Sequence, residues 1–396
     1  MDKKLGINWP ISDKHGWGIF ALNLLVSLLF RGSPLPILLT PAPEPLENIL
    51  PEGEMRNLVA SIDVIARELR EKLADNPGKI MTMSDATVLH ALGNRLFSDP
   101  ELDRFQGGRN LGMVFLEDTD LDAAAVERGR SYDCLLGGST WCAESLKSSG
   151  LQSARVLFQG VDITLFNPGE VAAAFPGRFV VFSGGKLEYR KGQDIVLAAF
   201  KVFHQRHPEA LLVTSWQNLW PEGAASIAGG PHVDRGPEAA DGNRLFIEAW
   251  SRDMGHPEGA VIDLGWISNT SMPDILRGCD AAVFTNRCEG GTNLVAMEAM
   301  ACGVPCVISA NTGHLDLIDD GENCYPLKDQ ESLAGEGGVR TGWGESSVEE
   351  VVDCLESIYS DRQEAALRGR RGVEFISGWN WRQQTEKLVE ILESLA

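Results

Sequence analysis

The chain has 396 residues, which is too long for one ordinary core and fits two domains. Its apolar share of 43% is normal for a folded protein and argues against extensive disorder. The formal net charge of −21 opposes binding to nucleic acid or anionic lipid through general electrostatics. We therefore expect a small-molecule site, with neither a nucleic-acid partner nor a stable membrane attachment.

The cysteines and the N-terminal segment bear on location. Eight cysteines show no CxxC pair and no zinc-knuckle spacing, and several sit in apolar runs as small hydrophobic residues do. We interpret them as reduced, with no metal site, in a cytoplasmic protein. No secretory signal is visible at the N-terminus. The apolar run 19–30 carries Asn23 and Ser27 and is too short to span a bilayer, so it predicts a buried helix.

The first half of the chain alternates predicted strands and helices. A strand at 5–9 leads into a polar turn with His15, Gly16 and Gly18, and an apolar helix follows at 19–29. Alternation of this kind is typical of a parallel, doubly wound α/β sheet. The further elements predicted are strands at 37–40, 79–83, 110–116, 133–137 and 156–159, a proline-rich loop at 41–51, and helices at 58–73 and 87–97, the former with Leu58, Ile62, Ile65 and Leu69 on one face.

A second alternating series begins near Arg178 with the strand RFVVFSGG. The region 217–259 is rich in Gly, Pro and Asp, which predicts an insertion of loops and short helices. The other elements predicted are a helix at 191–207, strands at 211–215, 260–264 and 324–327, a helix at 272–277, and three closing helices at 347–359, 363–375 and 380–396. Each half therefore resembles a dinucleotide-type domain.

The stretch 280–307, DAAVFTNRCEGGTNLVAMEAMACGVPCV, predicts a strand, a loop, a helix and a second strand. The loop holds Glu289, Gly290 and Gly291, and the helix carries Glu298. Backbone N–H groups and the positive end of the helix dipole meet at such a loop, an arrangement that suits a diphosphate. Two carboxylates beside it suggest a phosphate joined to a hydroxyl-rich group. The alternative is an ordinary glycine loop with a solvated Glu289 and a helix-surface Glu298.

The stretch 182–192, FSGGKLEYRKG, ends a strand with two glycines and opens a helix with Arg190, Lys191 and Gly192. Two or three cations above a helix N-terminus can neutralise a diphosphate without a divalent metal. The alternative is a polar turn whose cations are solvated.

Together these motifs resemble retaining glycosyltransferases of family 4. GKLEYRKG from Gly185 is similar to the family's G-R-L-x-x-x-K-G turn, with Lys186 in place of the usual Arg. TNRCEG followed by NLVAMEAMACGVP resembles the donor-site motif of two glutamates and a G-x-P turn. GVDITLFNP at 160–168, LGWIS at 264–268 and the aromatics at 379–381 add to the resemblance, which covers about residues 156–395. The N-terminal half matches only in its glycine loop and general pattern.

The resemblance implies a GT-B fold, in which two doubly wound Rossmann-like domains face a cleft. Residues 1–160 would be the acceptor-side domain and residues 161–378 the nucleotide-sugar donor-side domain. Residues 379–396 would form a closing helix that crosses back onto the first domain.

The resemblance also implies the reaction, which is transfer of a hexose-like sugar from a nucleotide diphosphate sugar with retention at the anomeric carbon. No metal or other cofactor would be required. The acceptor would be a saccharide, a lipid-linked molecule, a protein or a small molecule. The sequence leaves open the nucleotide base, the sugar, the acceptor and the oligomeric state.

Donor-site roles carry over residue by residue. Lys186 and Lys191, beside Gly185, would bind the diphosphate, and Glu298 would bind the ribose hydroxyls. Glu289 would face the transferred sugar. Eight residues separate the two glutamates, one more than the family usually has, and we place the extra residue in the loop after Glu289. This departure leaves the aim of Glu289 open. The loop residues expected to bind the distal phosphate are Gly290, Gly291, Thr292, Asn293 and, at the helix start, Leu294.

Other polar residues are weaker candidates. In the first domain the family places a His near the reacting sugar. Here Glu117, after a predicted strand, could be the polar group near the acceptor. His90, expected on a helix, is either catalytic or a buried His whose hydrogen bonds are satisfied. Gly16 and Gly18 would approach the donor or acceptor, or form a plain turn. The D-T-D at 118–120 resembles a metal motif of another glycosyltransferase fold, and we discount it. In the second domain His314 or Asp316 would contact the sugar or cap a helix.

Two other functions remain open at this stage. The same fold could serve a nucleotide-sugar epimerase or hydrolase, which would need no acceptor. It could also serve a non-catalytic nucleotide-sugar binding protein, a hypothesis that the altered glutamate spacing and the missing first-domain His keep open.

Overall fold

The computed structural model describes residues 4–50, 52–170, 175–239, 244–319, 321–333 and 340–395. The chain divides into two compact units. The first comprises Met1–Gly160 and Trp379–Ala396, and the second comprises Val161–Gly378. Pro51 and Ala396, at the ends of two predicted segments, lie outside the described residues.

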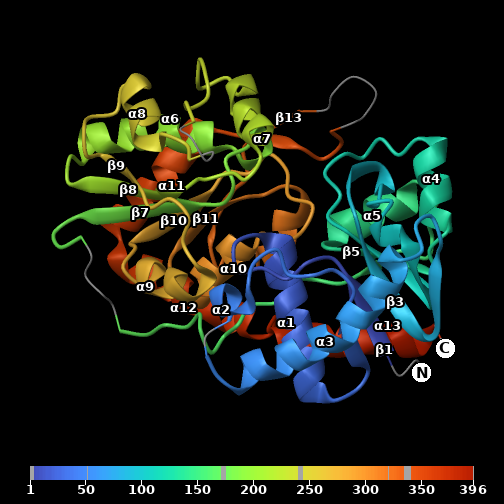
Figure 1. Ribbon diagram of the computed structural model, residues 1–396. Coiled ribbons are helices and arrows are strands. Elements are labelled where there is room, and N and C mark those ends of the chain that lie inside the picture. The colour runs from blue at the N-terminus through green and yellow to red at the C-terminus, as the bar shows by residue number, and fades with distance from the viewer. Residues whose placement is uncertain are drawn as a thin grey trace. The chain divides into compact units, whose positions relative to one another are not determined.

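The first unit, whose strands β1, β3 and β5 are labelled in Figure 1, contains a six-stranded parallel sheet in the order β2-β1-β3-β4-β5-β6. The interior strand β1 is buried from Leu5 to Asn8, so both of its faces are covered, as in most parallel sheets. The strands of this sheet are β1 Lys4–Asn8, β2 Leu35–Leu38, β3 Met81–Leu92, β4 Phe105–Val114, β5 Cys134–Gly137 and β6 Arg155–Val156. The α-helices of the first unit are α1 Gly16–Arg31, α2 Leu46–Ile49, α3 Glu54–Ala74, α4 Ala123–Arg130, α5 Thr140–Ser148 and α13 Trp381–Ser394. Helix α13 packs on α1, where the rings of Phe20 and Trp381 stack with centroids 5.6 Å apart.

Three predictions for this unit are wrong. The predicted helix at 87–97 is the second half of the long strand β3, so His90 lies in a strand. Its run of buried residues has no polar alternation, because both faces of the central sheet are covered, and such a run cannot be told from a helix by periodicity. Helix α1 begins at Gly16, so Gly16 and Gly18 are helical. On α3 the buried face is Val59, Ile62, Ala66 and Leu73, while Leu58 and Ile65 are 42% and 53% exposed.

The second unit contains another six-stranded parallel sheet, in the order β12-β11-β10-β7-β8-β9. The region 217–259 holds only short helices and loops among its described residues, as predicted. The small antiparallel pair β13–β14 was not predicted. The strands are β7 Phe179–Gly184, β8 Ala210–Ser215, β9 Val261–Asp263, β10 Ala281–Phe284, β11 Cys306–Ser309, β12 Tyr325–Leu327, β13 Gln330–Ser332 and β14 Gly344–Ser346; the helices are α6 Gln193–Arg206, α7 Pro221–Ala225, α8 Ile247–Asp253, α9 Met272–Leu276, α10 Leu294–Ala301, α11 Val348–Ser360 and α12 Arg362–Ser377.

The winding of the second sheet fixes where a site can form. From β7 the chain winds outward through β8 and β9, and then returns to β10, which pairs with β7. Helices α6 and α11 pack together over one face, and α10 and α12 pack together over the other (Figure 1). The segments that follow β7 and β10 leave the same edge of the sheet at its switch point, where open α/β sheets bind ligands.

All eight cysteines are free thiols, and six of them are buried. Among the described residues, no helix has the length and apolar character needed to cross a membrane.

Candidate functional site

The basic turn after β7 is shaped by two glycines with positive φ. Gly185 has φ +113°, and Gly192, at the start of α6, has φ +68°. A Cβ at Gly192 would lie 2.2 Å from the backbone oxygen of Thr285, which follows β10. Only glycine therefore lets the turn approach the neighbouring loop this closely.

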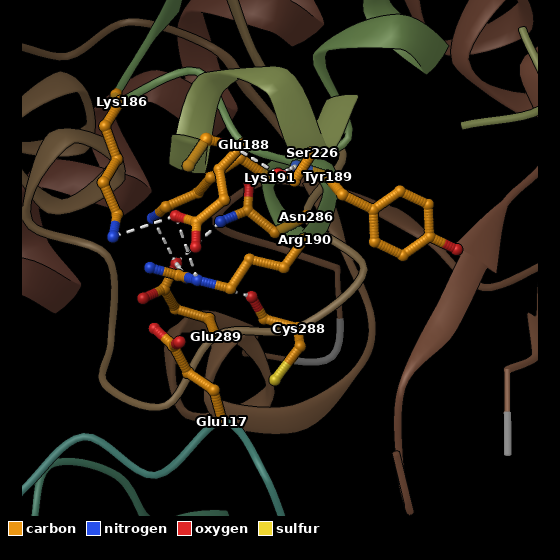
Figure 2. Close-up of polar contacts among 12 residues, drawn as sticks. Glu117, Lys186, Glu188, Tyr189, Arg190, Lys191, Ser226, Asn286, Cys288 and Glu289 are labelled. Atoms are coloured by element: carbon orange, nitrogen blue, oxygen red, sulfur yellow. Dashed lines mark hydrogen bonds and ion pairs between the residues drawn. The ribbon is translucent and has the colours of Figure 1, made fainter. Parts of the chain in front are cut away.

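Backbone hydrogen bonds join this turn to the loop after β10. The oxygen of Arg190 accepts from the N–H groups of Arg287, at 2.7 Å, and Cys288, at 3.2 Å. The hydroxyl of Thr285 donates to the oxygen of Gly192 at 2.6 Å. The two segments, about a hundred residues apart in sequence, thus form one structure, and the ribbon and side chains around it are drawn in Figure 2.

The side chain of Arg287 holds this structure from within. Its guanidinium is fully buried and donates two hydrogen bonds to Asp194, at 2.8 and 2.7 Å. It also pairs with Glu345, donates to the oxygen of Tyr189 at 2.7 Å, and lies 4.3 Å from the Tyr189 ring centre. Burial alone would lower the pKa of Arg287, but the bonds to Asp194 and Glu345 outweigh burial and raise it. Arg287 is therefore a permanent cation that anchors the turn.

Three possible metal ligands meet beside this arginine. Asp194, His232 and Glu345 place one ligand atom each within 4.8 Å of one another. The carboxylates of Asp194 and Glu345 are already bonded to Arg287. Because a metal ion would have to replace the guanidinium, we interpret this group as an ion-pair network.

Glu289 lies where the turn and the loop meet. Its Oε2 atom is 2.5 Å from Nζ of Lys191 and accepts from Nδ2 of Asn286 at 2.7 Å. A guanidinium nitrogen of Arg190 lies 3.4 Å away. Burial acts to raise the pKa of the carboxyl, but Lys191 and Arg190 outweigh it and lower the pKa to about 2. Glu289 is ionised at neutral pH, and in this structure its carboxylate contacts the turn's cations.

Glu298 has the opposite environment. It sits on α10, 5% exposed, and its Oε1 atom accepts from Nδ2 of Asn269 at 2.7 Å. Asn269 comes directly after the LGWIS turn. Burial raises the pKa of Glu298 to about 8, although the bond from Asn269 acts to lower it. This carboxyl is therefore protonated at neutral pH and can donate a hydrogen bond.

Glu298 should make stability depend on pH. Between pH 4.5 and about 8 the folded protein keeps a proton that the unfolded chain has released. Raising the pH through this window therefore lowers the free energy of unfolding, and above about 8 the contribution is lost. We expect Glu298→Gln to flatten this slope in urea unfolding measured from pH 5 to 8. The exposed Glu258→Gln should keep it, and an unchanged slope in Glu298→Gln would contradict the assignment.

His314 supports the loop from below. It is fully buried, with Nε2 3.0 Å from Nδ2 of Asn293 and Nδ1 2.9 Å from the hydroxyl of Ser309. That hydroxyl donates to the oxygen of Asn286, so the network assigns the proton to Nδ1 and makes Nε2 the acceptor. Burial lowers the pKa of His314 to about 4. The neutral ring thereby holds Asn293 in place. This residue has a φ of +62° and directly precedes the first residue of α10.

Thr312 and Gly313 also hold the loop after β10. The N–H of Gly313 donates to the oxygen of Glu289 at 2.9 Å, and the hydroxyl of Thr312 accepts from the Glu289 N–H at 2.8 Å. A Cβ at Gly313 would lie 1.9 Å from the oxygen of Gly291. Gly290, Thr292 and their neighbours are thus held in a buried loop.

Most of the predicted site residues lie together in the second unit. Lys186 is the outermost cation, with Nζ 2.9 Å from Glu188 Oε2 and 5.7 Å from the Trp220 ring centre (Figure 2). Helix α10 carries Glu298 about one turn after its first residue, Leu294. The residues at or beside the joined turn and loop are Gly185, Lys186, Lys191, Glu289, Gly290, Gly291, Thr292, Asn293, Leu294 and Glu298.

The four remaining candidates belong to the first unit. His15 caps α1, where its Nδ1 accepts from the N–H of Gly18, and Gly16 is the first helical residue. A Cβ at Gly18 would lie 2.3 Å from that of Ser12, so this glycine has a packing role. Glu117 follows β4, with its N–H bonded to Asn94.

His90 is 1% exposed and belongs to a buried polar network. Its Nε2 lies 3.0 Å from Asn110 Oδ1, and its Nδ1 lies 3.4 Å from Asn8 Nδ2 and 3.5 Å from Asp103. This environment favours the interpretation as a satisfied buried His.

Sequence reasoning missed several residues that shape the site. Arg287 was noted only as motif context, and Glu188 only as a variable position of the turn. Asp194 and Glu345 carried no local signal, because their partner Arg287 lies far away in the sequence. Glu188, an acidic residue inside an otherwise basic motif, was the one clue to these contacts in the sequence.

Comparison with solved structures gives the class of fold. The chain is similar to sucrose-phosphate synthase from Thermosynechococcus elongatus, with a TM-score of 0.65 and 15% identity over 99% of this chain and 98% of that one. It is also similar to Anabaena HepE in complex with UDP and glucose, with a TM-score of 0.62 and 15% identity over the whole of both chains. The predicted fold, two Rossmann-like α/β units of the GT-B type, is confirmed.

Sequence comparison gives the kind of protein. Residues 177–336 match the model of the family described as glycosyl transferases group 1. A GDP-mannose-dependent phosphatidylinositol monomannoside mannosyltransferase of Mycolicibacterium smegmatis is 25% identical over 59% of this chain and 54% of its own length. Mannosylfructose-phosphate synthase of Agrobacterium fabrum is 30% identical over 38% of this chain and 29% of its own. The resemblance to family 4 glycosyltransferases that the motifs indicated is confirmed. The matches span about half or less of these relatives.

Proposed function

We propose that this chain transfers a sugar from a nucleotide diphosphate sugar to an acceptor, with retention and without a metal ion at the diphosphate. The observation that carries the proposal is the joined turn and loop at the switch point of the second sheet. It gathers Lys186, Arg190 and Lys191 at the start of α6, beside a glycine loop that opens α10. Cations and helix N-termini together are suited to stabilise a departing diphosphate.

The other residues fit roles around that leaving group. A protonated Glu298 is suited to hydrogen-bond a ribose hydroxyl, since it can donate as well as accept. Glu289 would face the transferred sugar from its place beside Lys191. The acceptor oxygen would form the new bond to the anomeric carbon as the bond to the diphosphate breaks. Its proton would pass to the departing phosphate oxygen on the same face.

Relatives give further support for the donor class. The HepE structures were solved with UDP, with UDP and glucose, and with UDP-glucose. The M. smegmatis relative is named as GDP-mannose-dependent. We therefore propose a nucleotide sugar as donor, while both UDP and GDP sugars must be tried. The free cysteines support a cytoplasmic location for the reaction.

A panel of UDP and GDP sugars tests the proposal. Thermal unfolding should shift upward with the correct nucleotide, because a ligand at 100 times its Kd adds roughly 2.7 kcal/mol to stability. Slow donor hydrolysis that persists in EDTA would support a metal-independent transferase. A new sugar isomer would instead indicate an epimerase, and binding without turnover a non-catalytic binding protein. If no nucleoside diphosphate or nucleotide sugar shifts the unfolding temperature, the donor site is wrong.

A further inference from the structure

The basic turn carries its own counter-ion. Glu188 lies among the turn's cations, with Oε2 2.9 Å from Nζ of Lys186 and 3.4 Å from Nε of Arg190 (Figure 2). Its side chain is 19% exposed. Burial acts to raise the pKa of this carboxyl, but Arg190, Lys186 and Lys191 outweigh it and lower the pKa. Glu188 is therefore an anion at neutral pH, placed against the groups expected to bind phosphate.

The second carboxylate at the turn is held differently. The backbones of both residues are hydrogen-bonded, but the side chain of Glu289 also accepts a hydrogen bond from Asn286 at 2.7 Å. The Oε2 atom of Glu188, in contrast, is buried within ion-pair range of two cations but has no hydrogen bond of normal geometry to any described part of the chain. Of the two carboxylates, that of Glu188 is the one held mainly by charge.

The cations of the turn are too few to neutralise a bound diphosphate together with both carboxylates. Lys186, Arg190 and Lys191 face the carboxylates of Glu188 and Glu289, so the turn offers one more cation than carboxylate. A diphosphate brings several negative charges and strong acceptor oxygens. Like charges this close repel in a partly buried site, so a bound diphosphate would displace the weakly fixed carboxylate.

We propose that Glu188 is an internal competitor for the diphosphate, which occupies the cations in the nucleotide-free protein and swings out when a nucleoside diphosphate binds. The inference rests on the proposed function, because it assumes that this turn binds the donor's diphosphate. Glu188 weakens binding of both donor and nucleoside diphosphate product, and it speeds product release.

Removing the charge of Glu188 should tighten anion binding. If the turn is open about one tenth of the time, the apparent Kd is about tenfold above the intrinsic value. We expect Glu188→Gln to lower the Kd of pyrophosphate, UDP and GDP by roughly tenfold in isothermal titration calorimetry. The gain should be of similar size for orthophosphate, because the open fraction is a property of the ligand-free protein, and the dissociation rate of the nucleoside diphosphate should fall. Glu188→Asp keeps the charge on a shorter side chain, so its Kd values should lie between those of the native protein and those of Glu188→Gln.

The matched control is Glu258→Gln, the same charge change at an exposed residue of the same unit, which should leave every Kd unchanged. Circular dichroism verifies that each variant is folded. Unchanged or weaker diphosphate binding by folded Glu188→Gln would overturn the inference while leaving the proposed function intact. If neither the native protein nor the variant binds any diphosphate, the proposed function itself fails.

Discussion

Replacing Arg287 with methionine should lower the free energy of unfolding of the second unit by about 3 to 5 kcal/mol, the usual cost of breaking a buried ion pair by removing one partner. Methionine fills much of the same volume but leaves the buried Asp194 and the partly buried Glu345 without their shared cation. It also removes the bond to the oxygen of Tyr189, so the basic turn should loosen. Urea unfolding followed by far-UV circular dichroism measures the loss.

Two further variants show whether charge is the cause. Arg235→Met removes an ion pair with Asp253 in which both side chains are at least half exposed, and it should cost less than about 1 kcal/mol. Adding Asp194→Asn to Arg287→Met removes the stranded charge, so part of the loss should return. A loss below about 1 kcal/mol in Arg287→Met would mean that the network does not hold the site together.

Replacing Lys191 with alanine should weaken binding of nucleoside diphosphates more than tenfold. The lysine is mostly buried at the start of α6, and a charge-assisted contact of this kind contributes about 1.5 to 3 kcal/mol. The exposed Lys328→Ala, in the same unit, should bind with native affinity. Calorimetric titration with UDP and GDP measures the change, and an unchanged Kd would remove the phosphate role.

Loss of Lys191 also leaves the carboxylate of Glu289 buried with one cation fewer, so the fold must be assessed separately. The double variant Lys191→Ala with Glu289→Gln removes the stranded charge. If affinity stays low while the unfolding temperature recovers, the lysine binds the phosphate directly. If affinity recovers with stability, the lysine's part is structural.

The sequence was sufficient for the α/β class and for the order of most elements in the second unit. Its strands and helices are separated by glycine turns that appear in the pattern itself. Errors arose where burial hid the pattern. Val88, Leu89 and His90 lie in a strand covered on both faces, so no alternation marked it. On α3 the residues Val59 and Ala66 belong to the buried face. The larger Leu58 had led us to predict a different buried face, but Leu58 is exposed.

The candidate site was predictable to the extent that it is made of local motifs. The turn and the glycine loop were each recognisable, and the structure brings them together. Their connections were not predictable, because Arg287 lies 93 residues from Asp194 and 58 from Glu345. The protonation states of Glu289 and Glu298 were also beyond sequence reasoning. They depend on how fully each carboxyl is buried and on whether a cation lies next to it.

The course of the chain through its units sets an order for biosynthesis. Helix α13 belongs to the first unit, although the whole second unit is translated before it. Trp379 stacks on Phe158 and Trp381 on Phe20, so Phe158 and Phe20 lack these partners until residues 379–396 have left the ribosome. Domains usually fold in order of synthesis. Here the second unit can complete its core before the first unit receives its last helix.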